Sequence, residues 1–182
     1  MRTIQTKIYT IDELKKENKQ GFENALQNIS ERRVQSFMDH YSSEMMDTLE
    51  AVAEKFYMEI MNYNYDLFST SHITVNIDDY MELENSEKNN LVQWLKDNLQ
   101  SGKDGSCPFT GVCYDADFFD QIEQLSNGDI NYNNLHVLIP DAIEKTLNKI
   151  LKYEGDNILN DNDNFRYAQE MELEFLESGE IY

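Results

Sequence analysis

The chain has 182 residues, of which 40% are hydrophobic and 12% aromatic, and its formal net charge is −20 at pH 7. That apolar fraction excludes a disordered chain, and the length suits one domain with a hydrophobic core, so we expect a single domain over residues 1–182. With 15 Lys+Arg against 35 Asp+Glu, the chain lacks the clustered cations that bind a phosphate backbone, which excludes direct nucleic-acid binding by a basic surface.

The first third of the sequence predicts a short strand and then helices. Residues 3–10 alternate loosely and carry β-branched side chains, as strands do. Thr10 and Glu13 have the spacing of a capping box, so a helix should begin there. A helical stripe continues from Phe22 with a bend near Ser30. A further helix, capped by one of two serines at 42 and 43, should run to Ile60.

The middle of the sequence predicts the main strand. Residues 66–78 are rich in β-branched side chains, with Ile73, Val75 and Ile77 on the buried face. A helix capped by Asn85 or Ser86 and ended by Gly102 should follow. A shorter helix is expected over residues 115–125.

An apolar stripe from Leu135 to Leu151 contains Pro140. Either one helix kinks at the proline, or a strand over 135–139 ends and a helix begins there. We favour one kinked helix that ends at Gly155, because the 3.6-residue period continues across the proline. After it we expect a helix capped by Asp161 or Asn162, and then a C-terminal strand pair that turns at Ser178–Gly179.

Together these elements predict an α+β fold. Five or more helices should pack around a small, mostly antiparallel sheet formed by the N-terminal strand, residues 66–78 and the C-terminal hairpin.

The segment DGSCPFTGVCYDADFFD (104–120) is the strongest candidate for chemistry. Its cysteines, Cys107 and Cys113, have a C-x5-C spacing and no second pair, which argues against zinc. We interpret them as small buried side chains on either side of a turn. Asp115 should cap a helix on which Asp117 and Asp120 share a face, and the alternative is a divalent-metal site of the kind that nucleases use.

Other signals of catalysis or of a membrane are missing from the sequence. It contains no nucleotide-binding, serine-hydrolase or zinc-protease motif, so we expect a protein that is not an enzyme and needs no cofactor or metal. The N-terminus has no apolar core of a signal peptide, and no run has the length of a membrane span. Two cysteines then suit a reducing compartment, which predicts a cytoplasmic protein without a membrane partner.

Acidic and aromatic residues form the expected contact surface. Carboxylates presented where a basic partner expects phosphates would act by competition, with association that weakens at high salt. The alternative is a charged face that only solubilises the chain. The expected partner-binding residues are Asp78, Asp79, Glu82, Glu84, Glu87, Asp115, Asp117, Asp120, Asp156, Asp161, Asp163, Tyr63 and Tyr65.

Two segments, CPFTGVCYDADFFDQI (107–122) and EFLESGEIY (174–182), resemble small acidic proteins carried by phages and mobile elements of Gram-positive bacteria. Several of those proteins are anti-CRISPR proteins, which inhibit the type II RNA-guided nuclease. The matching residues are Thr110, Gly111, Cys113, Asp115, Asp117, Glu174, Phe175, Gly179, Ile181 and Tyr182.

The resemblance implies an inhibitor that binds a type II CRISPR effector nuclease, with or without guide RNA, in the bacterial cytoplasm. It would block target DNA binding or cleavage through an acidic surface that mimics nucleic acid. The effector has positively charged channels and an arginine-based PAM-reading site, which suit an acidic partner. Two alternatives stay open: a metal-dependent nuclease acting on guide RNA or DNA through Asp115 and Asp117, and an anti-restriction DNA mimic or antitoxin.

Overall fold

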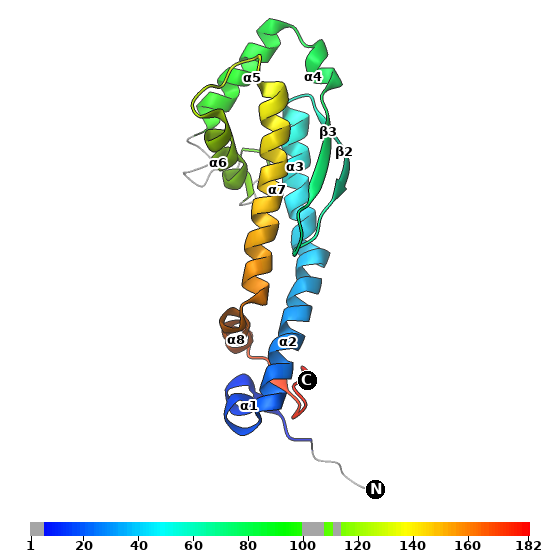
Figure 1. Cartoon of the computed structure of the whole chain (residues 1–182), viewed down its shortest axis with the longest axis vertical. Coiled ribbons are helices and arrows are strands. Elements are labelled where there is room, and N and C mark those ends of the chain that lie inside the picture. Colours follow the sequence, from blue (N-terminus) through cyan, green and yellow to red (C-terminus); the bar gives the residue numbers. More distant parts are fainter. Residues whose placement is uncertain (1–5, 100–107, 111–113) are drawn as a thin grey trace. The chain divides into compact units, whose positions relative to one another are not determined.

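The computed structural model describes residues 6–99, 108–110 and 114–182 (Figure 1). The predictions for Cys107, Cys113 and the helix end at Gly102 lie outside the described residues. Contacts divide the chain into two compact units: unit 1 is Met1–His40 with Glu154–Tyr182, and unit 2 is Tyr41–Tyr153. A single domain stays a prediction, and each unit is described by itself.

Helices make up most of the described chain. The elements of unit 1 are β1 (Tyr9–Thr10), α1 (Ile11–Glu17), α2 (Lys19–Ser36), α8 (Asp161–Glu170) and β4 (Glu174–Phe175). Those of unit 2 are α3 (Ser42–Lys55), β2 (Glu59–Asn64), β3 (His72–Asn76), α4 (Asp78–Glu82), α5 (Asn85–Asn98) and α6 (Tyr114–Ser126). The π-helical turn η1 (Phe37–Tyr41) and α7 (Leu135–Leu159) have residues in both units.

The start of α1 is the predicted capping box. The Thr10 hydroxyl accepts from the Glu13 backbone N–H at 3.3 Å, and the Glu13 carboxylate accepts from the Thr10 N–H at 2.8 Å. Asn18 then ends α1 and caps α2, because its side-chain oxygen accepts from the Gly21 N–H at 3.0 Å.

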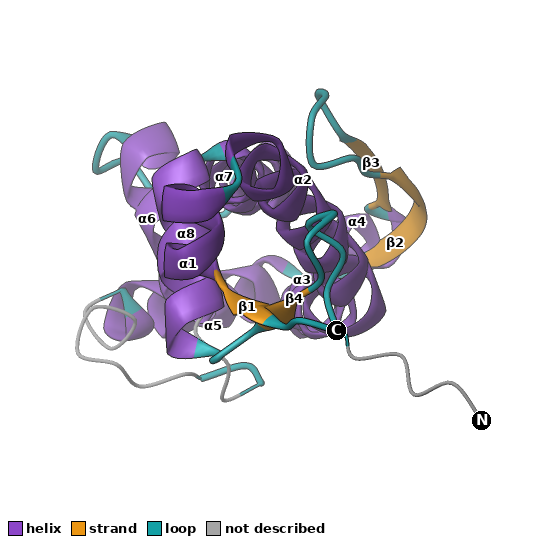
Figure 2. Ribbon diagram, turned by 90° about the horizontal axis from the view of Figure 1, so that it is seen from below, coloured by secondary structure: helices purple, strands orange, loops and turns teal. Residues whose placement is uncertain are grey.

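The two ends of the chain pair in unit 1. β1 and β4 are antiparallel, with Tyr9 opposite Phe175, and Phe175 also bridges to Ile181 (Figure 2). The predicted pairing of the N-terminal strand with the C-terminal hairpin is confirmed. The core behind it consists of Tyr9, Ile11, Leu14, Ala25, Ile29, Ala168 and Phe175.

The C-terminal turn lies directly on α2. Side-chain amides of Asn18, Asn24 and Asn28 donate to the backbone oxygens of residues 177, 178 and 179 at 2.8–2.9 Å. Gly179 has φ +91°, and a Cβ there would overlap the Gly21 oxygen. Only glycine fits this turn, because the two backbones touch.

In unit 2, the prediction that the helix from Ser42 runs to Ile60 is wrong. α3 ends at Lys55, where the Tyr57 N–H donates to the Glu54 oxygen at 3.0 Å and the Met58 N–H to the Ala53 oxygen at 2.9 Å. This is the Schellman arrangement, with Tyr57 at φ +56° in the position that glycine usually takes. The chain therefore reverses at Tyr57 and enters β2.

The main strand is shorter than predicted and has another partner. β3 pairs antiparallel with β2, with Tyr63 opposite Ile73, so the expected single sheet is wrong: β1–β4 and β2–β3 are separate two-stranded sheets. A near neighbour in sequence pairs more readily than a distant strand, since less chain entropy is lost. Ile73, Val75 and Ile77 are only partly buried.

The α+β class with five or more helices is confirmed.

α7 settles the ambiguity at Pro140 in favour of one helix that contains the proline. The prediction that it ends at Gly155 is wrong, because Gly155 is buried inside a helix that continues to Leu159. The N-cap of α8 is Asn160 rather than the predicted Asp161 or Asn162.

No helix among the described residues combines the length and the apolar character that a membrane crossing needs.

Candidate functional site

Five exposed carboxylates follow β3 along α4 and the start of α5. We call them the α4–α5 acidic segment; its members are Asp78, Asp79, Glu82, Glu84 and Glu87. Glu87 accepts from the Glu84 backbone N–H at 2.9 Å and so helps α5 to begin. Within the described part of the chain, Asp78, Asp79 and Glu82 have no ion pair or side-chain hydrogen bond. No neighbouring group among the described residues therefore neutralises their charges.

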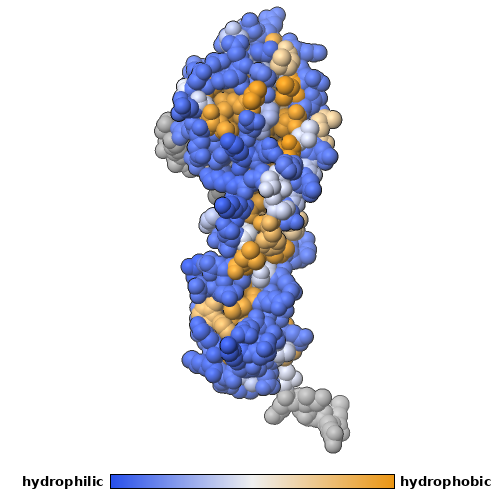
Figure 3. All heavy atoms as spheres, viewed as in Figure 1, coloured by the Kyte–Doolittle hydropathy of each residue, from blue (hydrophilic) through white to orange (hydrophobic). Residues whose placement is uncertain are grey.

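The negative charge is concentrated in the unit that carries this segment. Unit 2 has 20 Asp+Glu and 7 Lys+Arg, a formal charge of −13, and unit 1 has 15 and 8, a formal charge of −7. On the face that Figure 3 shows, hydrophilic residues cover most of the surface and apolar residues appear as patches between them. A field of this sign attracts basic surfaces and repels phosphates.

The tyrosines of the expected contact set lie together in unit 2. The rings of Tyr63 and Tyr65 stack with their centroids 5.7 Å apart and an interplanar angle of 22°. Tyr63 lies in β2 and is 46% exposed. The pair thus offers an aromatic surface to solvent.

Asp117 and Asp120 share a face of α6, as predicted, and both bind one lysine. Lys149 Nζ lies 2.8 Å from Asp117 Oδ1 and 3.1 Å from Asp120 Oδ2. The hydrogen bond to Asp117 raises the pKa of Lys149, and the bond to Asp120 adds to the rise. These two carboxylates are half-buried and partly neutralised, so they are weaker contacts for a basic partner than the α4–α5 acidic segment.

The expectation that Asp115 contacts a partner is wrong for this structure, because its side chain is fully buried. Asp115 Oδ2 accepts from the Phe109 N–H at 2.8 Å, and Oδ1 accepts from the Thr110 hydroxyl at 3.4 Å. Asp115 therefore positions Phe109. The described residues contain no group of three or more His, Cys, Asp and Glu side chains arranged for a metal ion.

Burial raises the pKa of Asp115, and hydrogen bonds from Phe109 and Thr110 partly oppose the rise. The stabilising contribution of Asp115 is thus complete below its ordinary pKa of 3.8 and is lost as the pH rises through the higher folded-state value. Asp115→Asn keeps an acceptor for the Phe109 N–H and does not ionise, so its stability should increase relative to the unaltered chain as the pH rises from 3.8.

Urea unfolding of both chains over a series of pH values measures this effect. Asp115→Ala leaves the Phe109 N–H without its acceptor. This variant should lose about 1–3 kcal/mol of unfolding free energy at every pH of the series. A constant difference between Asp115→Asn and the unaltered chain at every pH would contradict the prediction.

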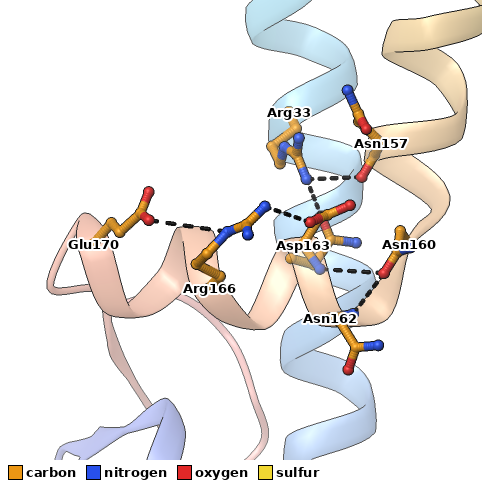
Figure 4. A network of polar contacts seen from close by, with 8 residues as sticks. Arg33, Asn157, Asn160, Asn162, Asp163, Arg166 and Glu170 are labelled. Carbon is orange, nitrogen blue, oxygen red and sulfur yellow. Dashed lines mark hydrogen bonds and ion pairs between the residues drawn. The ribbon is translucent and has the colours of Figure 1, made fainter.

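The remaining expected residues belong to unit 1, and Figure 4 shows the contacts around one of them, Asp163. Asp163 Oδ1 accepts from Arg166 at 2.6 Å, while Asp156 and Asp161 are exposed. Arg33 donates to the Asn157 oxygen at 3.1 Å and to the Asn164 side chain at 2.7 Å, which ties α2 to the α7–α8 corner. Asp163 itself contacts Asn160, whose side-chain oxygen accepts from the Asp163 N–H at 3.3 Å, and Arg166, so its carboxylate is partly neutralised.

Sequence reasoning missed an open groove in unit 2 with a volume of about 820 Å³. We call it the aromatic groove; it is lined by Ala51, Glu54, Lys55, Tyr57, Met58, Asp79, Leu91, Trp94, Pro108 and Phe109. It includes Asp79 of the α4–α5 acidic segment. Trp94, the only tryptophan of the chain, lies in α5, and no sequence signal indicates that it lines a groove.

A cluster of rings forms one side of the aromatic groove and continues into the core. The Trp94 centroid lies 5.4 Å from that of Phe109 and 6.0 Å from that of Phe56. Phe109 in turn stacks on Phe119 at 5.6 Å and meets the edge of Phe118 at 5.7 Å. The ring surface is therefore held from behind by buried side chains.

No protein-family model, curated protein or solved structure matches this chain. Function must therefore be argued from the charge, the groove and the residues described above.

Proposed function

We propose that this chain binds a type II CRISPR effector nuclease, with or without its guide RNA, and blocks target DNA binding or cleavage. One observation carries the proposal: Asp78, Asp79 and Glu82 are exposed and unpaired within the described chain, in a unit of formal charge −13. The likeness of residues 107–122 and 174–182 to anti-CRISPR proteins supplies the class of effector. The chain would act in the bacterial cytoplasm, where the effector works.

The physical basis is competition for cationic surfaces. An effector holds its guide and target in positively charged channels, and its PAM-reading site contains arginines. Exposed carboxylates attract the same cations that bind DNA phosphates, and desolvated Arg–carboxylate pairs are strong and directional. No bond is broken in this mechanism, so the chain needs no catalytic group or cofactor.

Titration of the full chain into a guided DNA cleavage reaction tests the proposal. We expect cleavage to stop near one inhibitor per effector, with inhibition weaker at high ionic strength because salt screens exposed charges. The inhibitor should also migrate with the guide-loaded effector on a sizing column. Unchanged cleavage at excess inhibitor, across several type II effectors, would sink the proposal.

A second assay separates binding from hydrolysis of the guide. Target DNA binding by a catalytically inactive effector is measured in parallel reactions with and without chelator, and the guide RNA is then recovered from each reaction and sized. Binding predicts that the block persists and that the RNA stays intact. A block that chelator abolishes, together with shortened RNA, would instead support a metal-dependent nuclease.

A further inference from the structure

We infer that the aromatic groove receives an arginine side chain from a basic segment of a protein partner, and that Lys55 holds this place in the free chain. The inference rests on the proposed function only in taking the partner to be a basic protein. The identity of the effector does not enter it.

The groove already shows which chemistry its ring surface accepts. Lys55 Nζ lies 4.4 Å from the centroid of the Trp94 ring, within the range of a cation–π interaction. Tryptophan is the strongest aromatic partner for a cation. A guanidinium is planar and more weakly hydrated than an ammonium, so an arginine stacks on the same ring at a lower desolvation cost.

Two carboxylates in the lining complete a site for arginine. Glu54 and Asp79 are exposed, and neither side chain has an ion pair or hydrogen bond within the described residues. A guanidinium has five N–H donors and binds carboxylates through paired hydrogen bonds. The charge of unit 2 would repel a phosphate ligand, so charge complementarity selects a basic protein segment.

The walls of the groove are fixed before any partner arrives. Phe109 is held by the hydrogen bond to Asp115 and by stacking on Phe119. Tyr57 is kept at φ +56°, a conformation that costs a bulky residue free energy and that glycine would adopt without strain. The backbone strain at Tyr57 is accounted for if the tyrosine ring contributes to binding the arginine.

Because Trp94 is the only tryptophan, its fluorescence reports on the groove without labelling. The probe is an oligoarginine peptide, compared with an oligolysine peptide of equal length and titrated into the full chain. We expect saturable changes in Trp94 fluorescence and binding by oligoarginine that is about three- to tenfold tighter.

Four variants test the named residues. Lys55→Gln should tighten oligoarginine binding about threefold by freeing the Trp94 ring, whereas Lys145→Gln, an equal charge change at an exposed site on α7, should have a smaller effect. Glu54→Gln with Asp79→Asn should weaken binding about tenfold, and Asp47→Asn with Asp141→Asn is the control of equal charge.

The variant Tyr57→Gly tests the groove wall with a substitution that should not lower the stability of the chain. It should weaken oligoarginine binding while leaving the unfolding midpoint unchanged or higher, because glycine suits the left-handed position. Glu172→Gly, at the same position of the turn after α8 and with φ +50°, should raise stability without affecting binding.

Equal affinity for oligoarginine and oligolysine, or equal tightening by Lys55→Gln and Lys145→Gln, would mean attraction by overall charge and would overturn the inference. If the groove variants bind oligoarginine normally while the chain still inhibits an effector, only the inference fails. If the groove binds oligoarginine as expected but no effector is inhibited, the proposed function fails and the inference stands.

Discussion

Replacing Asp78, Asp79 and Glu82 by their amides is expected to weaken inhibition of a guided nuclease about ten- to hundredfold at low ionic strength. Each exposed carboxylate that meets a cation contributes about 0.5–1 kcal/mol, and three of them convert to that factor. The substitutions keep side-chain size, and these carboxylates have no partner within the described chain, so the fold should persist. The measurement is the inhibitor concentration that halves cleavage, at low and high salt.

The matched control is Asp47→Asn, Glu50→Gln and Asp141→Asn, which removes the same charge from exposed positions of α3 and α7. An equal loss of inhibition in both triple variants would show that net charge alone acts, against a contact at the α4–α5 acidic segment. The double variant Asp78→Asn/Glu82→Gln leaves the groove lining intact and therefore separates this segment from the arginine site.

Gly179→Ala is expected to destabilise unit 1 by about 2–4 kcal/mol. The residue has φ +91°, and an added Cβ would overlap the Gly21 oxygen and lie 2.7 Å from the Ala25 nitrogen. Neither backbone can yield without moving the turn away from α2, which would stretch the hydrogen bonds from Asn24 and Asn28. Urea unfolding followed by circular dichroism gives the free energy.

Amide hydrogen exchange shows which part of unit 1 is destabilised by Gly179→Ala. The Tyr182 N–H, which donates to the Glu174 oxygen at 2.8 Å, should lose protection in Gly179→Ala. Gly128→Ala is the control, because Gly128 has φ +86° but nothing within 4 Å of the added Cβ, so only about 1 kcal/mol of backbone strain is expected. Similar losses of unfolding free energy in Gly179→Ala and Gly128→Ala would refute the close approach of the C-terminal turn to α2.

Asp115 shows how far the candidate site was visible in the sequence. The helix beginning near it was correctly expected, but Asp115 lies inside α6 rather than at its cap, and its carboxylate accepts from Phe109 and Thr110 rather than facing a partner. Burial depends on the loop that folds over a residue, which a single sequence does not specify. The exposure of the α4–α5 acidic segment was easier to predict, because charged side chains stay in water unless the fold supplies partners.

The secondary structure also divides into features that the sequence predicted and features that it missed. The capping box at Thr10 and the continuous helix through Pro140 depend on residues three or four positions apart, and the sequence predicted both. The end of α3 at Lys55 was missed, because Tyr57 takes a conformation that its own preference opposes. β2 was missed because only its pairing with β3 makes it a strand.

The sequence by itself therefore determined most of the helices, the capping box at Thr10, the α+β class and the strongly acidic surface of this protein. These properties arise from the periodicity, the capping residues and the charge of neighbouring side chains. Tertiary structure decided the partner of each strand, the burial of Asp115 and the meeting of Glu54, Asp79, Trp94 and Phe109 in one groove. The β1–β4 pair and the groove join residues far apart in sequence, whereas β2–β3 and the contact of Asp115 with Phe109 join nearer ones; in each case the placement depends on packing against the rest of the unit rather than on local preference.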